Sequence, residues 1–198
     1  ALLLATLAAT LLGAPAFAQG AAPGPAVLVE IKDAIGPATK DHFLHALEHA
    51  EEVNAVVLVL QLDTPGGLDA AMRDMIQGIL ASEVPVVTYV GPSGARAASA
   101  GTFILYASHV AAMAPGTVIG SATPINSSGE DIEGDLGNKV KENAVAKIRE
   151  YAALRGRNAD WAEDAVRNGI SASASDAVEL NVVDLQARGE LVAGDPEQ

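Results

Sequence analysis

Apolar and polar residues follow two different periods along the chain, which predicts strands separated by helices. In 37–50 and 68–80 the apolar residues recur every three or four positions, as in helices, and a further apolar helix is expected up to Tyr106. Continuous apolar runs of the kind typical of strands are VLVEIK (27–32), AVVLVLQL (55–62), PVVTYV (85–90) and HVAAMA (109–114). The second run is apolar enough to predict a strand buried on both faces. This alternation favours an α/β fold with a mostly parallel sheet and right-handed crossovers.

The pattern breaks down over 116–137, where Gly, Ser, Asn, Asp and Glu replace the periodic apolar residues. A loop of this length is usually functional or disordered. Asn138 is expected to cap a helix that runs over 139–154. Two more helices, capped by Asn158 and Ser173, and a last strand at 182–187 are predicted to follow.

The N-terminus has the features of an export signal. Residues 1–18 carry no charge and end in Ala16-Phe17-Ala18, the A-x-A pattern of signal-peptidase sites, so a signal peptide is predicted, one expected to be truncated at its start. An N-terminal membrane anchor is the alternative, because the apolar run is close to the roughly 20 residues that span a bilayer. A linker (19–26) and one predicted domain (27–198) follow, with the domain expected outside the cytoplasm. Any further membrane domain would lie beyond Gln198.

Composition excludes several classes of function. The 12 basic and 25 acidic residues give a formal charge of −13, which would repel the phosphates of a nucleic acid. The chain has no cysteine, so disulfides, thiolate catalysis and sulfur-ligated metals are excluded. His42, His45 and His49 have a spacing that could hold a metal, but no carboxylate pattern accompanies them, and a solvated helix face is preferred. No metal or cofactor is expected.

Two predicted strand-to-helix turns could carry chemistry, because ligands of open α/β sheets bind where strands end. The first is Asp63-Thr64-Pro65-Gly66-Gly67, in which consecutive glycines let backbone N–H groups approach a ligand and receive an oxyanion. A plain tight turn is the alternative at this site. Either interpretation requires backbone that only glycine adopts freely.

The second turn holds Ser99 within GARAASAGTF (94–103). The small residues on both sides leave room for a substrate carbonyl to reach Oγ, and the helix that begins there supplies an N–H donor at Ala100. Alternatively the small residues only let the helix pack against the sheet, with Ser99 as its N-cap. An apolar substrate would contact the helix faces around Phe103.

A catalytic serine needs a base, because a hydroxyl is a weak nucleophile. His109 is a poor candidate, since ten residues of helix would carry it about 15 Å from Ser99. Lys139 is expected in the first turn of the helix after the long loop, where the helix dipole favours a neutral amine. Lys141 points to the opposite face of that helix, so only one of the two lysines can serve. Spacing alone does not choose between them.

Four segments in one order resemble the NfeD family of membrane-associated serine proteases, whose protease domain belongs to the ClpP/crotonase-like superfamily. The resemblance covers 27–185 and implies a ClpP/crotonase-like fold with repeated β-β-α/βαβ units. The segments are VVLVLQLDTPGGLDAAM, PVVTYVGPSGARAASAGTFI, MAPGTVIGSATPI and GRNADWAEDAV.

The resemblance implies a Ser-Lys dyad instead of a Ser-His-Asp triad. Its serine corresponds to Ser99, and its lysine, at the helix after the long loop, corresponds to Lys139, with Lys141 as the alternative alignment. The oxyanion hole would be formed by Gly66 and Gly67 together with the amide of Ala100. The resemblance further implies a homodimer and an apolar polypeptide substrate from a stomatin-like membrane partner.

Two other functions compete with a protease. Crotonase-type folds stabilise enolates of acyl-thioesters with paired backbone amides, although no basic cluster here would bind a phosphorylated carrier. A non-catalytic scaffold that binds membrane-protein partners is the second alternative, because possession of Ser99 and Lys139 is necessary for turnover but not sufficient.

Overall fold

The computed structural model describes residues 24–126, 129–130 and 132–188; the predicted signal peptide and most of the linker lie outside these residues. The main sheet has five strands in the order β1-β2-β3-β5-β8, and every neighbouring pair is parallel, as the sequence predicts. The strands are β1 (Ala26–Ile31), β2 (Val57–Leu62), β3 (Val86–Val90), β5 (Val110–Met113) and β8 (Leu185–Gln186).

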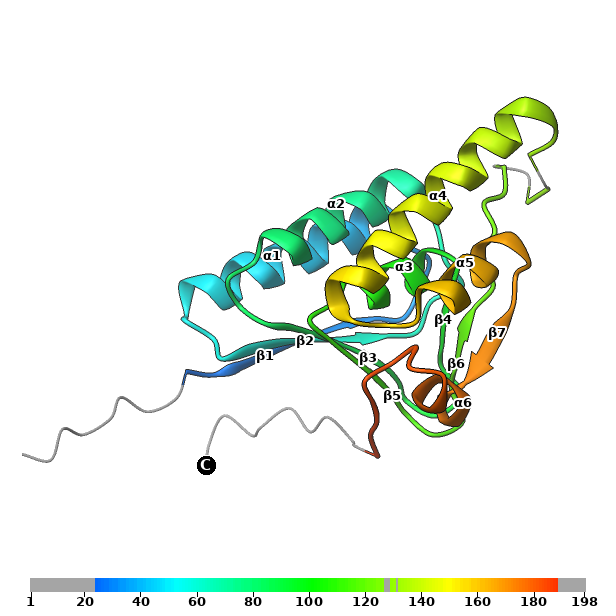
Figure 1. Cartoon of the computed structure of the whole chain (residues 1–198). Helices are drawn as coiled ribbons and strands as arrows, with labels where there is room; N and C mark the ends of the chain where they lie inside the picture. Colours follow the sequence, from blue (N-terminus) through cyan, green and yellow to red (C-terminus); the bar gives the residue numbers. More distant parts are fainter. Residues whose placement is uncertain (1–23, 127–128, 131, 189–198) are drawn as a thin grey trace, which may run out of the picture.

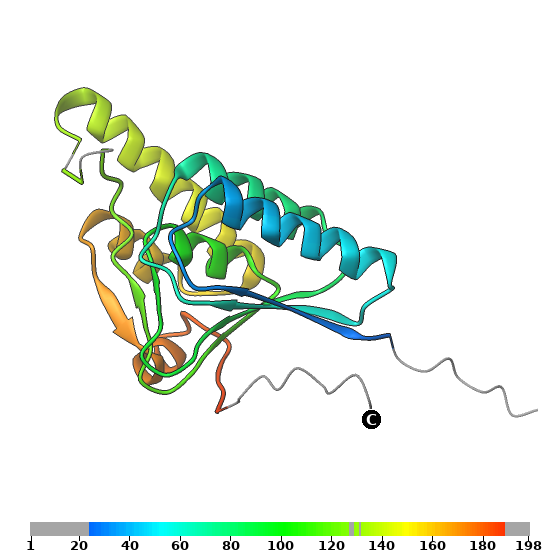
Figure 2. The same ribbon diagram turned by 180° about the vertical axis from the view of Figure 1, so that it is seen from behind.

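Three helices lie over the same face of this sheet in Figures 1 and 2: α1 (Pro37–Glu52), α2 (Asp69–Ala81) and α3 (Ala100–Ala107). Every second residue of β2 faces them and is fully buried. The intervening residues of β2 are only half-buried. The prediction that both faces of this strand are buried is therefore wrong, since the helices α1, α2 and α3 cover one face alone.

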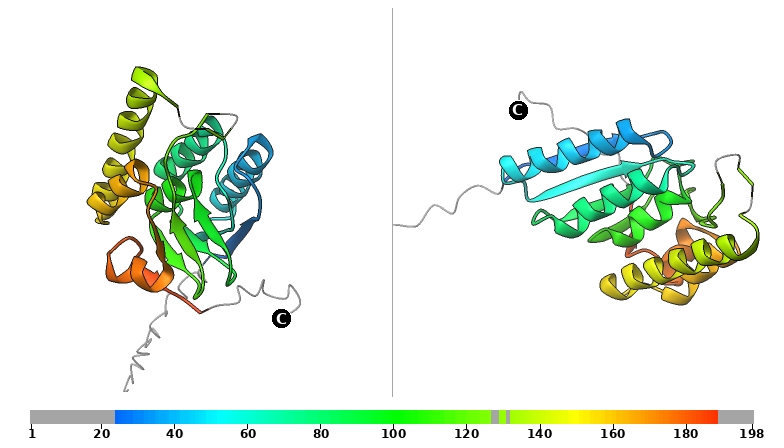
Figure 3. Two further views of the ribbon diagram at one scale, coloured as in Figure 1. Left: turned by 90° about the vertical axis from the view of Figure 1, so that its right-hand side faces the viewer. Right: turned by 90° about the horizontal axis from the view of Figure 1, so that it is seen from above.

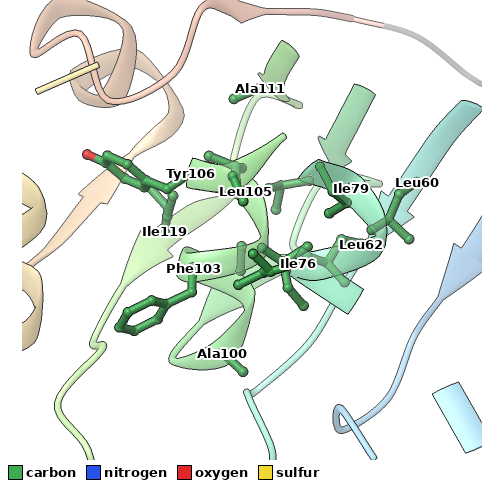
Figure 4. Close-up of a cluster of buried hydrophobic side chains, with 14 of the residues drawn as sticks. Leu60, Leu62, Ile76, Ile79, Ala100, Phe103, Leu105, Tyr106, Ala111 and Ile119 are labelled. Atoms are coloured by element: carbon green, nitrogen blue, oxygen red, sulfur yellow. The ribbon is translucent and has the colours of Figure 1, made fainter. Parts of the chain in front are cut away.

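Figure 4 shows how α3 joins the core. Leu105 lies among Ile76 and Ile79 of α2 and Leu62 of β2, all with at most 1% of their surface exposed. Phe103 points to the side of the helix away from the β2 side chains. The short helix is thus held by apolar contacts on one side while Phe103 is available to line a hollow on the other.

A second, three-stranded sheet adjoins the end of the main sheet where its strands finish. It has the order β4-β6-β7, with β4 and β6 parallel and β6 and β7 antiparallel. The strands are β4 (Arg96–Ala98), β6 (Val118–Gly120) and β7 (Ser171–Ser173). No strand is predicted at β4, and β6 lies within the stretch that is expected to be a loop, so the prediction is wrong at both places. Three-residue strands are too short to show a period.

The helix α4 (Gly134–Arg155) begins five residues before its predicted start. Its N-cap is Glu133, so the prediction that Asn138 caps the helix is wrong. The helix ends at Arg155, one residue after its predicted end, and Gly156 terminates it with a φ of 68°. The first turns of α4 project beyond the other helices in Figures 1 and 3. No helix within the described residues is both long and apolar enough to cross a membrane.

Two shorter helices follow with the predicted caps. The side chain of Asn158 accepts a hydrogen bond from Trp161 N–H at the start of α5 (Ala159–Arg167), and that of Ser173 accepts one from Asp176 N–H at the start of α6 (Ala174–Glu179). Both caps satisfy amides that would otherwise lack a partner at a helix start.

Arg157 connects the C-terminal end of α3 to Asp184, the residue before β8. It is 5% exposed. Nη1 donates to the carbonyls of Leu105, Tyr106 and Ser108, which lie at the C-terminal end of α3, over distances of 2.9 to 3.2 Å. Nη2 donates to Asp184 Oδ2 at 2.6 Å. This buried cation therefore satisfies the end of the helix that begins beside Ser99.

Replacing Arg157 by methionine is expected to destabilise the fold by about 3 to 5 kcal/mol, because Asp184 loses its cationic partner and three carbonyls lose a hydrogen-bond donor. Arg149→Met is the control, since the Arg149 side chain is 41% exposed and its ion pairs with Asp160 and Glu163 should each contribute about 1 kcal/mol or less. Urea unfolding of both variants measures the difference. Equal midpoints for the two variants would contradict this account of Arg157.

The stability of the folded protein is expected to depend on pH through the side chain of His109. Its Nδ1 accepts a hydrogen bond from Val86 N–H at 3.1 Å, so the ring is neutral. Burial, followed by the charges of Arg155 and Arg157, lowers the pKa of His109 below the usual 6.5. Because the pKa is lower in the folded state, the unfolded chain takes up the proton first as the pH falls. The stabilisation is complete above the unfolded pKa and is lost as the pH falls through the folded pKa.

The expected result is that wild-type stability decreases below a pH of about 6.5 more steeply than that of His109→Asn, whose side-chain oxygen can still accept from Val86. Melting temperatures from pH 8 to 5 measure the difference. Parallel pH profiles for the two proteins would show that His109 does not titrate in this way.

Candidate active site

Ser99 occupies a sharp turn between β4 and α3. Its φ of 51° and ψ of −114° are uncommon for a residue with a side chain, and such strained backbone persists where the surrounding structure fixes it, often at functional sites. Ser99 N–H donates to Gly120 O at 3.1 Å, and Ser99 O accepts from Thr102 N–H at 3.0 Å. A strand–serine–helix turn of this kind presents the hydroxyl at the end of the strands, as in a nucleophile elbow.

The hydroxyl of Ser99 does not cap the helix that follows it. Ser99 stands at the N-cap position of α3 but makes no side-chain capping hydrogen bond. The side chain is half-buried, and no hydrogen bond to Oγ occurs within the described part of the chain. The interpretation of Ser99 as a capping serine therefore does not hold, and Oγ is available to a ligand.

Close packing explains the glycines around Ser99. A Cβ on Gly66 would lie 2.6 Å from Ser99 Cβ, and a Cβ on Gly101 would lie 2.7 Å from Thr64 Cγ2. Both contacts are too short for real atoms, so side chains there would push the serine turn and the D-T-P-G-G turn apart. The two turns that the sequence singled out thus lie against each other.

The two glycines of that turn use their backbones differently. Gly66 N–H donates to Thr64 Oγ1 at 3.2 Å, and Gly66 O accepts from Ile35 N–H at 2.8 Å. Leu68 N–H donates to Ile35 O at 2.8 Å, so Ile35 bonds the residues on either side of Gly67. In such a parallel bridge Gly67 N–H points away from Ile35. Gly67 is exposed, and its N–H has no partner among the described residues.

Two hollows meet at Ser99. The first has a volume of about 510 Å³ and lies between α2, α3 and α4. The second has a volume of about 830 Å³ and runs along β4 and β6. Both are lined by Gly67, Asp69, Ser99 and Ile125. The first is also lined by Ala100, Phe103, Met72, Arg73, Ala122, Pro124, Ile132, Lys139, Val140, Asn143, Ala144 and Lys147.

The helix α4 brings one of the two predicted lysines to the first hollow. Lys139 lines it, whereas Lys141 does not. Lys139 lies in the second turn of α4 and is exposed, so its predicted position in the first turn is wrong. Lys147 lines the same hollow two turns further along and is half-buried. Lys147 is not among the residues predicted from the sequence, although its eight-residue spacing from Lys139 places both on one helix face.

The predicted histidines lie elsewhere. His109 bonds Val86 and lines neither hollow. His42, His45 and His49 are exposed on α1, on the helix face that the sequence analysis preferred to a metal site. The described residues contain no group of His, Cys, Asp and Glu side chains that could hold a metal ion.

The solved structures that resemble this chain include proteases. A serine-to-alanine mutant of the 1510-N membrane-bound stomatin-specific protease is 38% identical with a TM-score of 0.79, and the match covers 85% of this chain and 82% of that chain. A lysine-to-alanine mutant of the same protease, in complex with a substrate peptide, matches with the same identity and TM-score over 77% of its chain. ClpP1 from Listeria monocytogenes shares the fold at 17% identity, with a TM-score of 0.67 over 82% of this chain and 92% of that one. The fold is thus ClpP-like, as expected.

Two proteins with similar sequences are membrane proteins. The membrane-bound protease PH1510 of Pyrococcus horikoshii is 40% identical over 164 residues, which is 81% of this chain and 37% of that protein. Membrane protein NfeD1b of Bacillus subtilis is 33% identical over 118 residues, which is 59% of this chain and 25% of that protein. The chain therefore corresponds to well under half the length of these relatives. The model of the NfeD1b N-terminal domain matches residues 26–194, and the chain belongs to that family.

Proposed function

We propose that this chain is a serine endopeptidase with a Ser99–Lys139 dyad. The observation that carries the proposal is the strained turn that presents the Ser99 hydroxyl, unbonded among the described residues, to a hollow also lined by Lys139. The 1510-N protease, solved as a serine mutant and as a lysine mutant with a bound substrate peptide, supports the same pair of residue types.

The proposed reaction is acyl transfer. Neutral Lys139 takes the Oγ proton as Ser99 attacks the scissile carbonyl carbon, and the resulting ammonium then protonates the leaving amine. The carbonyl oxygen becomes an oxyanion that accepts hydrogen bonds from the amides of Gly67 and Ala100, the first residue of α3. Water, deprotonated by the same lysine, then hydrolyses the acyl-enzyme and restores Ser99.

Gly66 has a different role in this proposal from Gly67. Its N–H is already bonded to Thr64, so it is not a good donor to an oxyanion. Its missing side chain instead allows the turn to approach Ser99. The N–H of Ala100 belongs to the first turn of α3, where helical amides lack intrahelical partners.

The two hollows suit an extended polypeptide. They lie on different sides of Ser99, so a chain bound across it can continue in both directions, as cleavage within a polypeptide requires. Phe103, Met72 and Ala144 provide apolar contacts in the first hollow. These contacts, and the stomatin-specific relative, support an apolar segment of a stomatin-like membrane protein as substrate.

The remaining expectations are part of the same proposal. The chain acts as a homodimer on the extracytoplasmic side of a membrane, within a longer protein whose C-terminal part holds the membrane domain. The membrane-bound relatives, which extend well beyond the matched region, support the last point.

Incubation of the purified protein with extended apolar peptides, followed by mass spectrometry of the products, tests the proposal. Cleavage at an internal bond, with both fragments recovered, is the expected result. If the peptides bind but stay intact, the chain is a non-catalytic scaffold and not a protease. Hydrolysis of an acyl-thioester without peptide cleavage would favour the crotonase-type alternative.

Gly67→Ala is expected to reduce kcat/KM by roughly 10²- to 10³-fold, as loss of one oxyanion-hole donor does. A Cβ at this position would lie 2.0 Å from Ile35 O, so the N–H must move. Gly94→Ala is the matched control, because Gly94 also has a positive φ, at 93°, but has open space around it and lies outside both hollows. Peptide hydrolysis by the two variants, each checked for folding by circular dichroism, measures the effect. Wild-type activity in Gly67→Ala would remove this amide from the mechanism.

A further inference from the structure

The first hollow carries more positive than negative charge, although the protein as a whole is strongly acidic. Apart from Lys139, which acts as a neutral base in the proposed reaction, its charged lining consists of Arg73 and Lys147 against one carboxylate, Asp69. The whole chain has a formal charge of −13. Cations gathered around a hollow of such a chain favour a ligand that brings negative charge.

Lys147 has no anionic partner in the described part of the chain. It is half-buried in the wall of the hollow, and no ion pair involves it. Arg149 on the same helix pairs with Asp160 and Glu163, and Arg167 with Glu142 and Glu163. A lysine that stays unpaired among so many carboxylates has its charge available to a bound molecule.

Arg73 stands on the facing helix α2 and is also weakly paired. Its Nη1 lies 3.9 Å from Asp69 Oδ2, at the outer limit of an ion pair, and its side chain is 53% exposed. Burial raises the pKa of the Tyr151 phenol, one turn beyond Lys147 on α4, and the charge of Arg73 opposes this rise. Arg73 and Lys147 line the same hollow from two different helices.

The spacing along α4 places this cationic end relative to the dyad. Lys139 and Lys147 are eight residues apart, which is about 12 Å along a helix. An extended peptide advances about 3.3 Å per residue. A peptide whose scissile bond lies at Ser99 would therefore reach Lys147 within about four residues.

We propose that Lys147, assisted by Arg73, binds a carboxylate of the substrate chain within about four residues of the scissile bond. The carboxylate belongs to an acidic side chain or to the free C-terminus of the substrate. Apolar side chains of the hollow hold the neighbouring substrate residues, so the preferred ligand is an apolar peptide with one acidic group. This inference rests on the proposed function, because it assumes that the hollow binds a polypeptide.

Binding to the Ser99→Ala protein tests the inference independently of cleavage. The probes are fluorescent twelve-residue apolar peptides in matched pairs, each pair carrying Glu or Gln at one position. A second pair compares a free with an amidated C-terminus. The expected result in fluorescence anisotropy is that one Glu peptide, or the peptide with a free C-terminus, binds roughly three- to tenfold more tightly than its neutral counterpart. Raising the ionic strength should weaken this preference.

Three further variants assign the preference to Lys147. Adding Lys147→Met to Ser99→Ala should abolish it, and Lys147→Arg should preserve it, because the charge is retained. Lys141→Met is the matched control on the same helix; Lys141 lies outside the hollow, so the preference should persist. A Glu side chain and a terminal carboxylate are distinguished by which pair shows the effect.

Equal binding of charged and neutral peptides in every pair, or no binding of any acidic peptide, would overturn the inference. Persistence of the preference in Lys147→Met would do the same. The proposed function and this inference can fail separately. A Lys147-dependent preference without any cleavage by the wild-type protein would contradict the protease and support the carboxylate site. Cleavage by the wild-type protein, together with equal binding of neutral and acidic peptides, would support the protease and contradict the carboxylate site.

Discussion

Ser99→Ala is expected to reduce peptide cleavage by at least roughly 10³-fold, because the proposed acyl-enzyme forms on Oγ alone. The fold should be unaffected, since Oγ makes no hydrogen bond within the described residues and the backbone turn accommodates alanine as it does serine. Peptide hydrolysis at saturating substrate, compared with the wild-type protein, measures the loss.

Ser93→Ala is the control for this substitution. Ser93 is an exposed serine in the turn before β4 and lies outside both hollows, so its removal should leave the rate unchanged. Comparable cleavage by Ser99→Ala and the wild-type protein would show that another group is the nucleophile, or that a contaminating protease is responsible.

Lys139→Ala is expected to cause a loss of similar size, because Ser99 would lack its base. Lys139→Arg should not restore activity, since a guanidinium stays protonated in proteins and cannot accept the Oγ proton. Lys141→Ala should cleave at close to the wild-type rate, because Lys141 lies outside the hollow that contains Ser99. The three variants are compared by kcat/KM on one peptide.

This comparison also decides the alignment of the helix after the long loop. Loss of activity in Lys141→Ala, with activity retained in Lys139→Ala, would make Lys141 the base and require α4 to rotate in the active protein. Retained activity in both variants would remove lysine from the mechanism at these positions.

Four of the five strands of the main sheet could be predicted closely from the sequence because they lie in apolar runs. The runs at 27–32, 55–62, 85–90 and 109–114 match β1, β2, β3 and β5, with β1 beginning one residue before its run, and their parallel order follows from the helices between them. The strand predicted at 182–187 is only the two residues of β8. The three-residue strands β4 and β6 could not be predicted in the same way. Their pairing depends on contacts between residues about twenty positions apart, such as Ala97 with Ile119.

The site was predicted in part. The small residues around Ser99 and the two consecutive glycines identified the two turns, and the structure places them in contact. The positive φ of Ser99 could not be read from its residue type, because serine does not normally favour this conformation. The different hydrogen bonding of Gly66 and Gly67 depends on Thr64 and Ile35, which only the folded chain brings to the turn.

The start of α4 could not be predicted correctly from the sequence. The sequence placed its start at Lys139 because Asn138 is a good capping residue, yet the helix begins at Gly134 and contains both. Helix ends are difficult to locate where the flanking residues are polar and aperiodic. Lys147 lies within the predicted helix as well as the observed one, and its eight-residue spacing from Lys139 is the signal that places both lysines on one helix face.

Covalent labelling of Ser99 tests the central claim most directly. The protein is treated with a fluorophosphonate, which phosphonylates activated serines, and the modified residue is identified by peptide mass spectrometry. A single adduct on Ser99 is predicted in the wild-type protein and in Lys141→Ala, with much slower labelling in Lys139→Ala and none in Ser99→Ala. An unmodified wild-type Ser99, or labelling that proceeds equally fast without Lys139, would contradict the Ser99–Lys139 dyad.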